Sequence, residues 1–274
     1  MKHIDPRIYQ IAALAVLLTY GVTRLAFDVS ATRILLTLAI ATSTQFVCSR
    51  FARIPFDPKS AAISALSLSL LLRSNGFLLI AVAAVIAIAS KFILRWNGKH
   101  LFNPTCFAIV LLLATTDRVW VSPGQWGNVA FFGFLITCIG GLVVNRASRS
   151  DVTYAFIASW ALALFGRSAW LGEPMTIPLH RLENGALLLF TFFMISDPRT
   201  TPDSRAGRIL FAALVALGAG YIQFRLFRTN GILWSLAITS FFTPVIDMLF
   251  RAERFVWNRN GGPQCEPSSL SFSS

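Results

Sequence analysis

Residues 193–208 read FMISDPRTTPDSRAGR, and this stretch decides the fold. It closes an apolar run over residues 186–195, which is much shorter than the roughly 20 residues that a helix needs to cross a bilayer. A membrane segment that stops early leaves backbone carbonyls unpaired, which is tolerated only inside protein or beside a water-filled cavity. The stretch therefore predicts a discontinuous helix whose broken end at Asp197-Pro198 builds a site. The alternative is an ordinary helix end at the membrane surface, since Asp-Pro is a common turn starter.

The composition is that of a polytopic membrane protein. Of the 274 residues, 55% are hydrophobic and 13% are charged, whereas soluble domains carry roughly 25% charged residues. We expect no cleavable signal peptide, because no small-residue cleavage site follows the N-terminus. The net charge of +12 does not indicate nucleic acid, since the basic residues lie between apolar runs, where they set topology and meet anionic lipid. The four cysteines form no CxxC pair, so no metal site is predicted.

Ten apolar runs organise the chain, and the third, fifth and eighth are too short for a full span. The runs cover residues 11–26, 34–49, 60–72, 77–94, 104–115, 129–145, 152–166, 184–196, 209–223 and 231–250. We expect an N-terminal segment over 1–10, a ten-helix membrane domain over 11–251 and a disordered tail over 252–274. With the N-terminus inside, 16 Lys and Arg residues fall on the cytoplasmic side and 8 outside. This bias predicts a multi-pass protein of the inner (plasma) membrane with both termini in the cytoplasm.

The two halves, approximately residues 11–115 and 129–250, have similar patterns of apolar runs and helix starts. Asn103-Pro104 opens the fifth run and Asn230-Gly231 opens the tenth, so each half ends on a similar helix start. Five runs per half place the halves in opposite orientations, and inverted repeats with broken helices hold a site where the repeats meet. The predicted fold class is an all-α polytopic membrane protein of two inverted five-helix repeats with short or broken helices. In this fold Asn103, Asp197 and Asn230 should converge on one polar pocket.

Two helix starts could bind a ligand at that pocket. Asn103 fits the N-cap and Pro104 the first helical position, and Asn230 with Gly231 would do likewise. Two positive helix ends would then point inward, where they suit an anion or an electron-rich ring. The alternative for both is simple capping.

Other polar residues at the mouths of the runs complete the candidates. Asp197 and Arg199 could satisfy the broken helix end, and Asp197 could hold a cation or a flavin-ring N–H. Thr200 and Asn184 join them as cofactor-binding candidates, and Asp247 is a candidate for an ion pathway. For Asp197 and Arg199 the alternative is a local cap and salt bridge. For Asp247 the alternative is an interfacial position. No catalytic residue is predicted, because HExxH, GxSxG and Walker motifs are absent from the sequence, which argues against a hydrolase or an ATPase.

Four stretches, in order, resemble a known family. KHLFNPTCF at 99–107 resembles the FNP signature shared by the D-type subunit of the Rnf electron-transport complex and the B-type subunit of the sodium-translocating NADH:quinone oxidoreductase. FMISDPRTTP at 193–202 looks like the family's F-[MI]-x-T-D-P-x-[ST] signature. RAGRILFAAL at 205–214 is similar to its N-R-G-R-x-x-F-G-A stretch. TNG at 229–231 and PVID at 244–247 match its D-G and P-x-I-D positions.

The resemblance implies a ten-helix inverted-repeat fold, a place in membrane electron transfer and a flavin cofactor. In the family, FMN is joined through its phosphate to the threonine of an S-[GQ]-A-T motif in a long loop after the fifth helix. The matching loop here, residues 116–128, is short and lacks that motif. We therefore expect a divergent member with a noncovalent flavin (FMN or riboflavin) or with none.

These observations leave several functions open. The first is a membrane electron-transfer subunit that moves electrons across or within the membrane, with or without coupled ion transport. It would need other membrane or peripheral redox subunits, because nothing in the chain binds NADH or an iron–sulfur cluster. The second is a permease or channel on the same fold without redox activity, and the third is a membrane scaffold in a biosynthetic pathway. Fold alone does not decide among them.

Overall fold

The computed structural model describes residues 5–25, 27–122, 150–257 and 263–266. The predicted sixth run and most of the loop before it lie outside the described residues. Each of the other nine runs forms one helix or two consecutive helices. The helices of the first half are α1 (Pro6–Arg24), α2 (Ala31–Phe51), α3 (Pro58–Leu71), α4 (Phe77–Ile93) and α5 (Pro104–Thr115).

The second half contains the more interrupted helices. The eighth run is split into an α-helix and a one-turn π-helix, and the tenth into two helices that meet at an angle of 53°. Its elements are α7 (Ser150–Leu171), α8 (Thr176–Leu182), α9 (Gly185–Leu189), η1 (Phe190–Met194), α10 (Arg205–Phe224), α11 (Gly231–Phe241) and α12 (Thr243–Leu249).

The described residues form three short antiparallel strand pairs, two of which involve segments next to the helices of the first half. β1 (Leu72–Ser74) follows α3 and pairs with β4 (Val119–Val121), which follows α5, so Arg73 lies opposite Trp120. β2 (Arg95–Trp96) and β3 (Lys99–His100) form a hairpin between α4 and α5.

The C-terminal segment differs from the predicted disordered tail. β5 (Arg254–Trp257) pairs with β6 (Pro263–Glu266), with Arg254 opposite Glu266. The Arg254 side chain donates to the Asn97 carbonyl at 2.7 Å, which ties this hairpin to the β2–β3 turn. The FVW sequence of β5 consists of residues that favour strands. The prediction of disorder followed instead from the Gly, Pro and Ser content of the rest of the tail.

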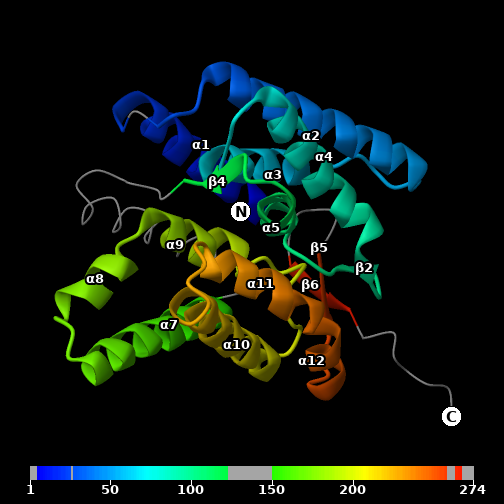
Figure 1. Cartoon of the computed structure of the whole chain (residues 1–274). Helices are drawn as coiled ribbons and strands as arrows, with labels where there is room; N and C mark the ends of the chain where they lie inside the picture. The colour runs from blue at the N-terminus through cyan, green and yellow to red at the C-terminus, as the bar shows by residue number, and fades with distance from the viewer. Residues whose placement is uncertain (1–4, 26, 123–149, 258–262, 267–274) are drawn as a thin grey trace, which may run out of the picture.

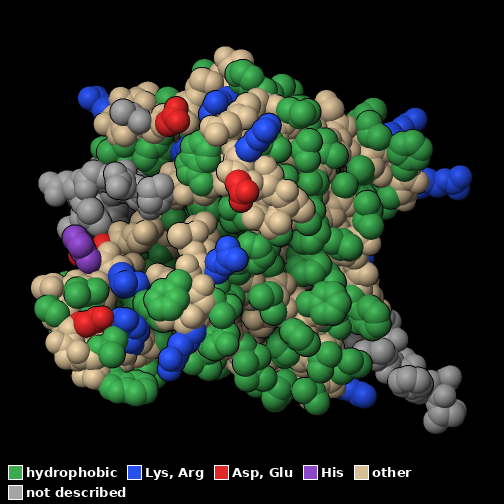
Figure 2. Space-filling model, in the orientation of Figure 1, with side chains coloured by type: hydrophobic (Ala, Val, Ile, Leu, Met, Phe, Trp, Pro, Cys, Tyr) green, Lys and Arg blue, Asp and Glu red, His purple; other side chains and the backbone are tan. Residues whose placement is uncertain are grey.

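Helix length and composition fit a polytopic helical membrane protein. Among the described helices, α2 and α10 are long and apolar enough to cross a bilayer, and the bent pair α11–α12 makes a third span if it counts as one. Large apolar side chains also lie exposed on the outside, for example Leu78 at 75%, Leu162 at 76% and Leu217 at 63%. Figure 2 shows hydrophobic side chains over much of the viewed face, which suits contact with lipid.

The two halves pack their helices in the same order. In the first half α4 packs against both α2 and α5, and in the second α10 packs against both α7 and α11 (Figure 1). Small residues allow close approach in both, since Ala83 and Ala87 of α4 and Ala212 and Ala216 of α10 are fully buried. The halves meet where α5 contacts α11.

Candidate functional site

The predicted interrupted helix is present, and its break lies inside the protein. α9 and η1 together span Gly185–Met194, about 15 Å at 1.5 Å per residue, or about half of the hydrocarbon thickness of a bilayer. Met194 is 2% exposed, and beyond the break Thr200 and Thr201 are 3% and 1% exposed. An ordinary helix end at the membrane surface would leave these residues in contact with solvent or headgroups. The π-turn is a feature often found at functional sites.

Side chains satisfy the carbonyls at the broken end. The Ser196 hydroxyl donates to the Phe192 carbonyl at 2.5 Å, and the Asn103 amide Nδ2 donates to the Met194 carbonyl at 3.3 Å. Asn103 also caps α5 as predicted, because its Oδ1 accepts from the Cys106 backbone N–H at 3.0 Å. The Asn103 side chain thus forms hydrogen bonds both with an N–H at the positive end of α5 and with a carbonyl at the negative end of η1.

Asp197 and Thr200 stabilise the loop that follows. Asp197 Oδ1 accepts from the Arg199 backbone N–H at 3.0 Å, and its carbonyl accepts from the hydroxyls of Thr200 at 3.3 Å and Thr201 at 3.1 Å. This is the local capping that the sequence offered as an alternative to ligand binding. Thr200 is therefore occupied with its own loop, whereas Asp197 and Arg199 also line a cavity.

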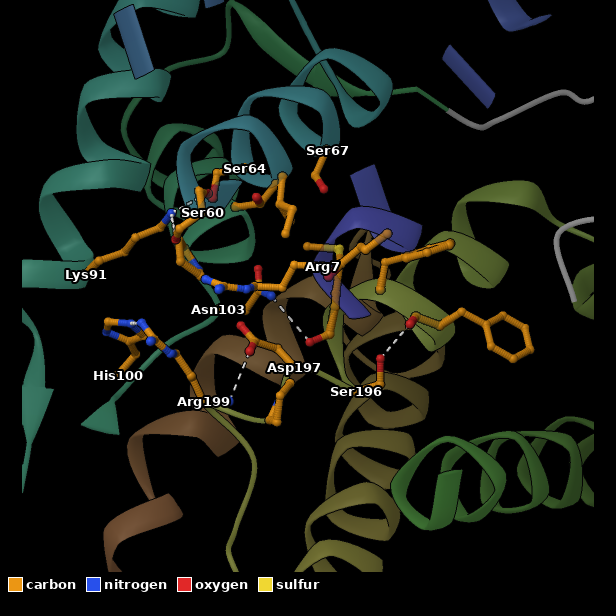
Figure 3. A pocket seen from close by; sticks show the side chains of 18 of the residues that line it. Arg7, Ser60, Ser64, Ser67, Lys91, His100, Asn103, Ser196, Asp197 and Arg199 are labelled. Carbon is orange, nitrogen blue, oxygen red and sulfur yellow. Dashed lines mark hydrogen bonds between the residues drawn. The ribbon is translucent and has the colours of Figure 1, made fainter. Parts of the chain in front are cut away.

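That cavity, the Asp197 cavity, lies between α3, α5 and the broken end. It has a volume of about 90 Å³, and its polar lining includes Ser60, Ser64, Lys91, Asn103, Asp197 and Arg199. Figure 3 shows Ser60 and Ser64 on one side, Asp197 and Arg199 on the other and Asn103 between them. Pro104 lines it too, so the N-terminus of α5 reaches this cavity.

Lys91 and three serines of α3 also line this cavity, and none of the four was given a binding role from the sequence. Lys91 donates from Nζ to the Ser60 carbonyl at 2.8 Å and to its Oγ at 3.0 Å. Ser60, Ser64 and Ser67 follow a four- and three-residue spacing on α3 that places them on one face of the helix. This spacing of hydroxyls in an apolar run is the sequence signal that could have found them.

His100 lies at the end of the Asp197 cavity as a neutral side chain. Its Nε2 is 3.3 Å from Arg199 Nη1, and the residue is 6% exposed. Burial, followed by the positive charges of Arg199, Arg95 and Lys91, lowers its pKa to about 3. Burial likewise lowers the pKa of Arg199.

A charged rim borders the same cavity near the start of the described chain. Arg7 bridges Asp5 at 2.8 Å and Asp57 at 2.6 Å, and Lys59 adds a second bond to Asp5 at 2.8 Å. Burial of Asp5 alone would raise its pKa, but the hydrogen bonds from Arg7 and Lys59 outweigh burial and lower the pKa to about 2. The rim therefore ties the start of α1 to the start of α3.

A second cavity, the Asn230 cavity, is larger and lies between α9, α11 and the β1–β4 pair. Its volume is about 420 Å³, and its polar lining includes Arg181, Asn184, Gln223, Thr229 and Asn230. Trp120 and Trp160 and several aliphatic side chains form the rest of the wall. Asn184 caps α9, since its Oδ1 accepts from the Ala186 backbone N–H at 2.8 Å.

Asn230 does not cap α11, which corrects the prediction. Its backbone is left-handed, with φ 59° and ψ 33°, and its side chain makes no capping bond. An N-cap needs an extended backbone to turn its side chain back over the helix start. The first residue of α11, Gly231, packs closely against α10. A side chain does not fit there, because a Cβ would lie 2.8 Å from the Ala219 carbonyl oxygen.

The structure divides the single expected pocket into these two cavities. Asn103, Pro104, Asp197 and Arg199 line the first, whereas Asn184, Asn230 and Gly231 line the second. The cavities face opposite ends of α3, since Ser60 and Ser64 line the first and Leu71 the second. Met194 lines both.

Asp247 lies elsewhere, in an ion-paired cluster. Its Oδ2 is 2.9 Å from Lys99 Nζ, and its Oδ1 accepts from the Asp203 backbone N–H at 2.8 Å. Lys99 also pairs with Asp203 at 3.0 Å. Asp247 thus joins α12 to the β2–β3 hairpin and to the loop before α10, and its role in an ion pathway stays a prediction. In the described part of the chain no cluster of His, Cys, Asp or Glu could hold a metal ion.

The sequence was compared with those of known proteins. The chain is similar to the D-type subunit of the ion-translocating oxidoreductase complex of Erwinia tasmaniensis, with 32% identity over 127 residues, or 45% of this chain and 34% of that protein. The D-type subunits of Citrobacter koseri and Escherichia coli K12 are 28% and 30% identical over 46% of this chain and 35% of their own lengths. The matched part thus spans about a third of these relatives. The profile of the NQR2, RnfD, RnfE family matches residues 117–256, just over half of the chain, and this chain belongs to that family.

Proposed function

We propose that this chain is a membrane-embedded electron-transfer subunit that binds a flavin noncovalently in the Asn230 cavity. Family membership and the names of the relatives, which are subunits of ion-translocating oxidoreductase complexes, support a redox role. The observation that carries the proposal is the Asn230 cavity itself, because its volume of about 420 Å³ falls within the range of typical cofactor pockets. The Asp197 cavity, at about 90 Å³, has room for only a few water molecules.

The side chains of the Asn230 cavity suit an isoalloxazine ring. Gln223 and Asn230 each carry an amide with donors and an acceptor, and Asn184 offers the N–H donors of an amide whose oxygen caps α9. These groups match the alternating carbonyl and N–H groups of the ring edge. Trp120 and Trp160 add aromatic surface to the wall, and Leu187 and other aliphatic residues exclude water. When bound, a flavin supplies one- and two-electron transfer, and the protein's part is to hold and orient the ring.

The finer architecture also belongs to this proposal. The matching packing of α2, α4 and α5 with α7, α10 and α11 supports two inverted five-helix repeats. The Lys and Arg bias supports an inner-membrane protein with cytoplasmic termini. The Asp197 cavity then opens toward the cytoplasm and the Asn230 cavity toward the outside. Electron donors and acceptors would be other subunits, since the relatives are named as subunits of a complex.

A pair of identical substitutions tests which cavity holds the flavin. Asn184→Ser and Asn103→Ser both keep a capping oxygen but remove an amide from different cavities. We expect the detergent-purified full chain to bind flavin, and Asn184→Ser to weaken binding about tenfold, the equivalent of one lost hydrogen bond. Flavin fluorescence quenching measures this. A loss that follows Asn103→Ser instead would move the site to the Asp197 cavity, and absence of binding to the unaltered chain would refute the proposal.

A permease or channel is a second candidate function, favoured by the position of Met194. Its side chain is 2% exposed and lines both cavities, which face opposite ends of α3. If the two cavities form a pathway, Met194→Ala should raise solute or ion flux in liposomes, with Met248→Ala, on exposed α12, as the matched control. Flux that is absent from the unaltered chain and unchanged by Met194→Ala would exclude this candidate.

A further inference from the structure

A third cavity lies where the ends of α7 and α10 meet. The two helices pack against each other, and the guanidinium carbon of Arg167 on α7 is 4.5 Å from the centroid of the Phe224 ring at the end of α10. The cavity, here called the arginine cavity, has a volume of about 340 Å³, and its lining includes Arg167, Arg181, Arg228, Phe224 and Phe227. Among the described residues that line it, none is acidic. It therefore concentrates positive charge around one hollow.

The length of α10 indicates the depth of this cavity in a membrane. α10 has 20 residues and is apolar enough to cross a bilayer, and at 1.5 Å per residue it is about as long as the hydrocarbon layer is thick. Its last residue, Phe224, lines the arginine cavity. A spanning α10 therefore places the cavity at the level where the hydrocarbon ends and the phosphate groups of the lipids begin.

Two of the guanidinium groups have donors that no protein group uses. Arg167 Nη1 pairs with Glu173 at 2.9 and 2.8 Å, which offsets its charge. Within the described part of the chain, the side chains of Arg181 and Arg228 take part in no hydrogen bond or ion pair. Their N–H groups are available to an anion, and a guanidinium fork matches two phosphate oxygens with parallel bonds.

Aromatic contacts restrict one of these free arginines before any ligand binds. The guanidinium carbon of Arg181 lies 5.1 Å from the centroid of the Phe224 ring. Phe224 in turn stacks on Trp160, with centroids 6.5 Å apart and planes 13° from parallel. Cation–π contact leaves the edge N–H groups of a guanidinium available, so less side-chain freedom is lost when an anion binds.

An apolar rim beside the arginines favours a lipid over a soluble anion. Phe227 lines the same cavity and is 85% exposed, and Leu226 beside it and Leu179 on α8 are each 52% exposed. A soluble phosphate would leave these side chains in water, whereas the acyl chains of a lipid would cover them. Figure 2 shows several blue Lys and Arg side chains close together on the part of the face formed by α7, α8 and α11, with green hydrophobic side chains around them.

Simple extension of arginines to the headgroup water does not explain the cluster. Arg225 fits that description, because it is exposed in the same loop and does not line the cavity. Arg167, Arg181 and Arg228 instead converge on one hollow. In the predicted topology these residues lie on the outer side, where the positive-inside rule disfavours arginine, so topology does not account for them either.

We propose that the arginine cavity binds an anionic glycerophospholipid, with its phosphate ion-paired to Arg181 and Arg228 and its acyl chains against Phe227 and the neighbouring apolar side chains. Basic pockets between spanning helices are suited to anionic headgroups. The inference is independent of the proposed flavin, because Arg228 and Phe227 line this cavity and not the Asn230 cavity.

The test compares two lipids of opposite headgroup character on the detergent-purified full chain. Thermal unfolding is followed while phosphatidylglycerol or phosphatidylcholine is titrated into the micelles, without flavin. We expect phosphatidylglycerol to protect at a concentration at least about tenfold lower than phosphatidylcholine, and added salt to reduce this preference. Arg181→Gln and Arg228→Gln should each raise the protecting concentration of phosphatidylglycerol about tenfold and leave that of phosphatidylcholine unchanged. Arg225→Gln is the matched control.

Other outcomes would overturn the lipid site. Equal protection by the two lipids would do so, and so would a loss in Arg225→Gln as large as that in Arg228→Gln, which would indicate diffuse surface charge. Glycerol 3-phosphate is the soluble probe, and protection by it equal to that of phosphatidylglycerol would make the ligand a soluble phosphate ester. If the variants already unfold early in phosphatidylcholine, native mass spectrometry of the unaltered chain decides: retention of phosphatidylglycerol over phosphatidylcholine supports the site, and equal retention refutes it.

Discussion

At the scale of single residues, the amide of Asn103 joins two interrupted helices. It accepts from the start of α5 and donates to the Met194 carbonyl, a residue 91 positions away in the chain. Asn103 is 6% exposed, so neither backbone group has water as a substitute partner. Leaving such a group unpaired costs roughly 1–3 kcal/mol.

Two substitutions of Asn103 separate its two bonds. Asn103→Ser keeps the capping oxygen and loses the bond to Met194, so we expect a loss of about 1 kcal/mol in the free energy of unfolding. Asn103→Ala loses both bonds and should cost about 2 kcal/mol. Denaturant or thermal unfolding in detergent measures both. If the serine variant is as unstable as the alanine variant, the cap contributes nothing.

His100 predicts how stability depends on pH. Its pKa is about 3 in the folded protein, below the ordinary value of 6.5, so the unfolded chain binds a proton that the folded chain does not. Stability should therefore fall as the pH drops below 6.5 and continue to fall toward pH 3. By pH 5 the loss is on the order of 2 kcal/mol.

The variant His100→Gln removes this titration and provides the comparison. Unfolding temperatures in detergent between pH 7.5 and 5 should fall for the unaltered chain and stay flatter for His100→Gln. Asp5 does not disturb this window. Its pKa is ordinarily 3.8 and is about 2 in the folded protein, so this carboxyl group titrates below pH 5. Parallel pH profiles for the two proteins would show that His100 is not the responsible group.

At the scale of elements, close contact between α10 and α11 determines where the Asn230 cavity begins. Gly231 is buried against the Ala219 carbonyl of α10, and Asn230 before it turns the chain in a left-handed conformation. The start of α11 thus lies at a fixed place beside Gln223 of α10. Wider separation of these helices would open the cavity and move the loop over residues 225–230 between them.

A matched pair of glycines tests this contact. Gly231→Ala would place a methyl group 2.8 Å from the Ala219 carbonyl, so we expect a loss of about 1–3 kcal/mol in stability. Gly166→Ala, within α7, meets no atom of the described residues within 4 Å and should stabilise by about 0.5–1 kcal/mol through helix propensity. Opposite shifts in unfolding temperature are expected. A neutral Gly231→Ala would mean that α10 and α11 can separate without cost.

At the scale of the whole molecule, the two cavities face opposite ends of the same helices. The Asp197 cavity carries the charged rim of Arg7 and Asp57, and the Asn230 cavity adjoins a hollow lined by Arg167, Arg181 and Arg228. In the proposed orientation the first faces the cytoplasm and the second the outside. The side of the membrane that each cavity faces decides from which side a ligand can reach it.

Cysteine labelling tests the orientation across α2, a helix long enough to span the bilayer. In a background without the native cysteines, Asp28→Cys and Ala52→Cys place exposed thiols beyond its two ends. An impermeant maleimide should label Asp28→Cys in intact cells and Ala52→Cys only after permeabilisation. The reverse pattern would place the Asn230 cavity on the cytoplasmic side.

Local patterns in the sequence by themselves determined several features that the structure confirms. The short eighth run predicts an interrupted helix, because its length is set by the number of apolar residues alone. Asn103-Pro104 predicts a capped helix start, since capping involves only neighbouring residues. The ordered motifs around Asp197 and Asp247 predict the family, which the profile match confirms.

Only the tertiary structure decided how these pieces meet. The sequence expected Asn103, Asp197 and Asn230 in one pocket, but Asn103 and Asp197 line one cavity and Asn230 another, with Met194 between them. Asn230 resembles Asn103 in sequence, yet contact of Gly231 with the Ala219 carbonyl of α10 gives it a different backbone and no capping role. Cavities and helix contacts join residues far apart in the chain, and their positions follow from packing volumes that no local pattern encodes.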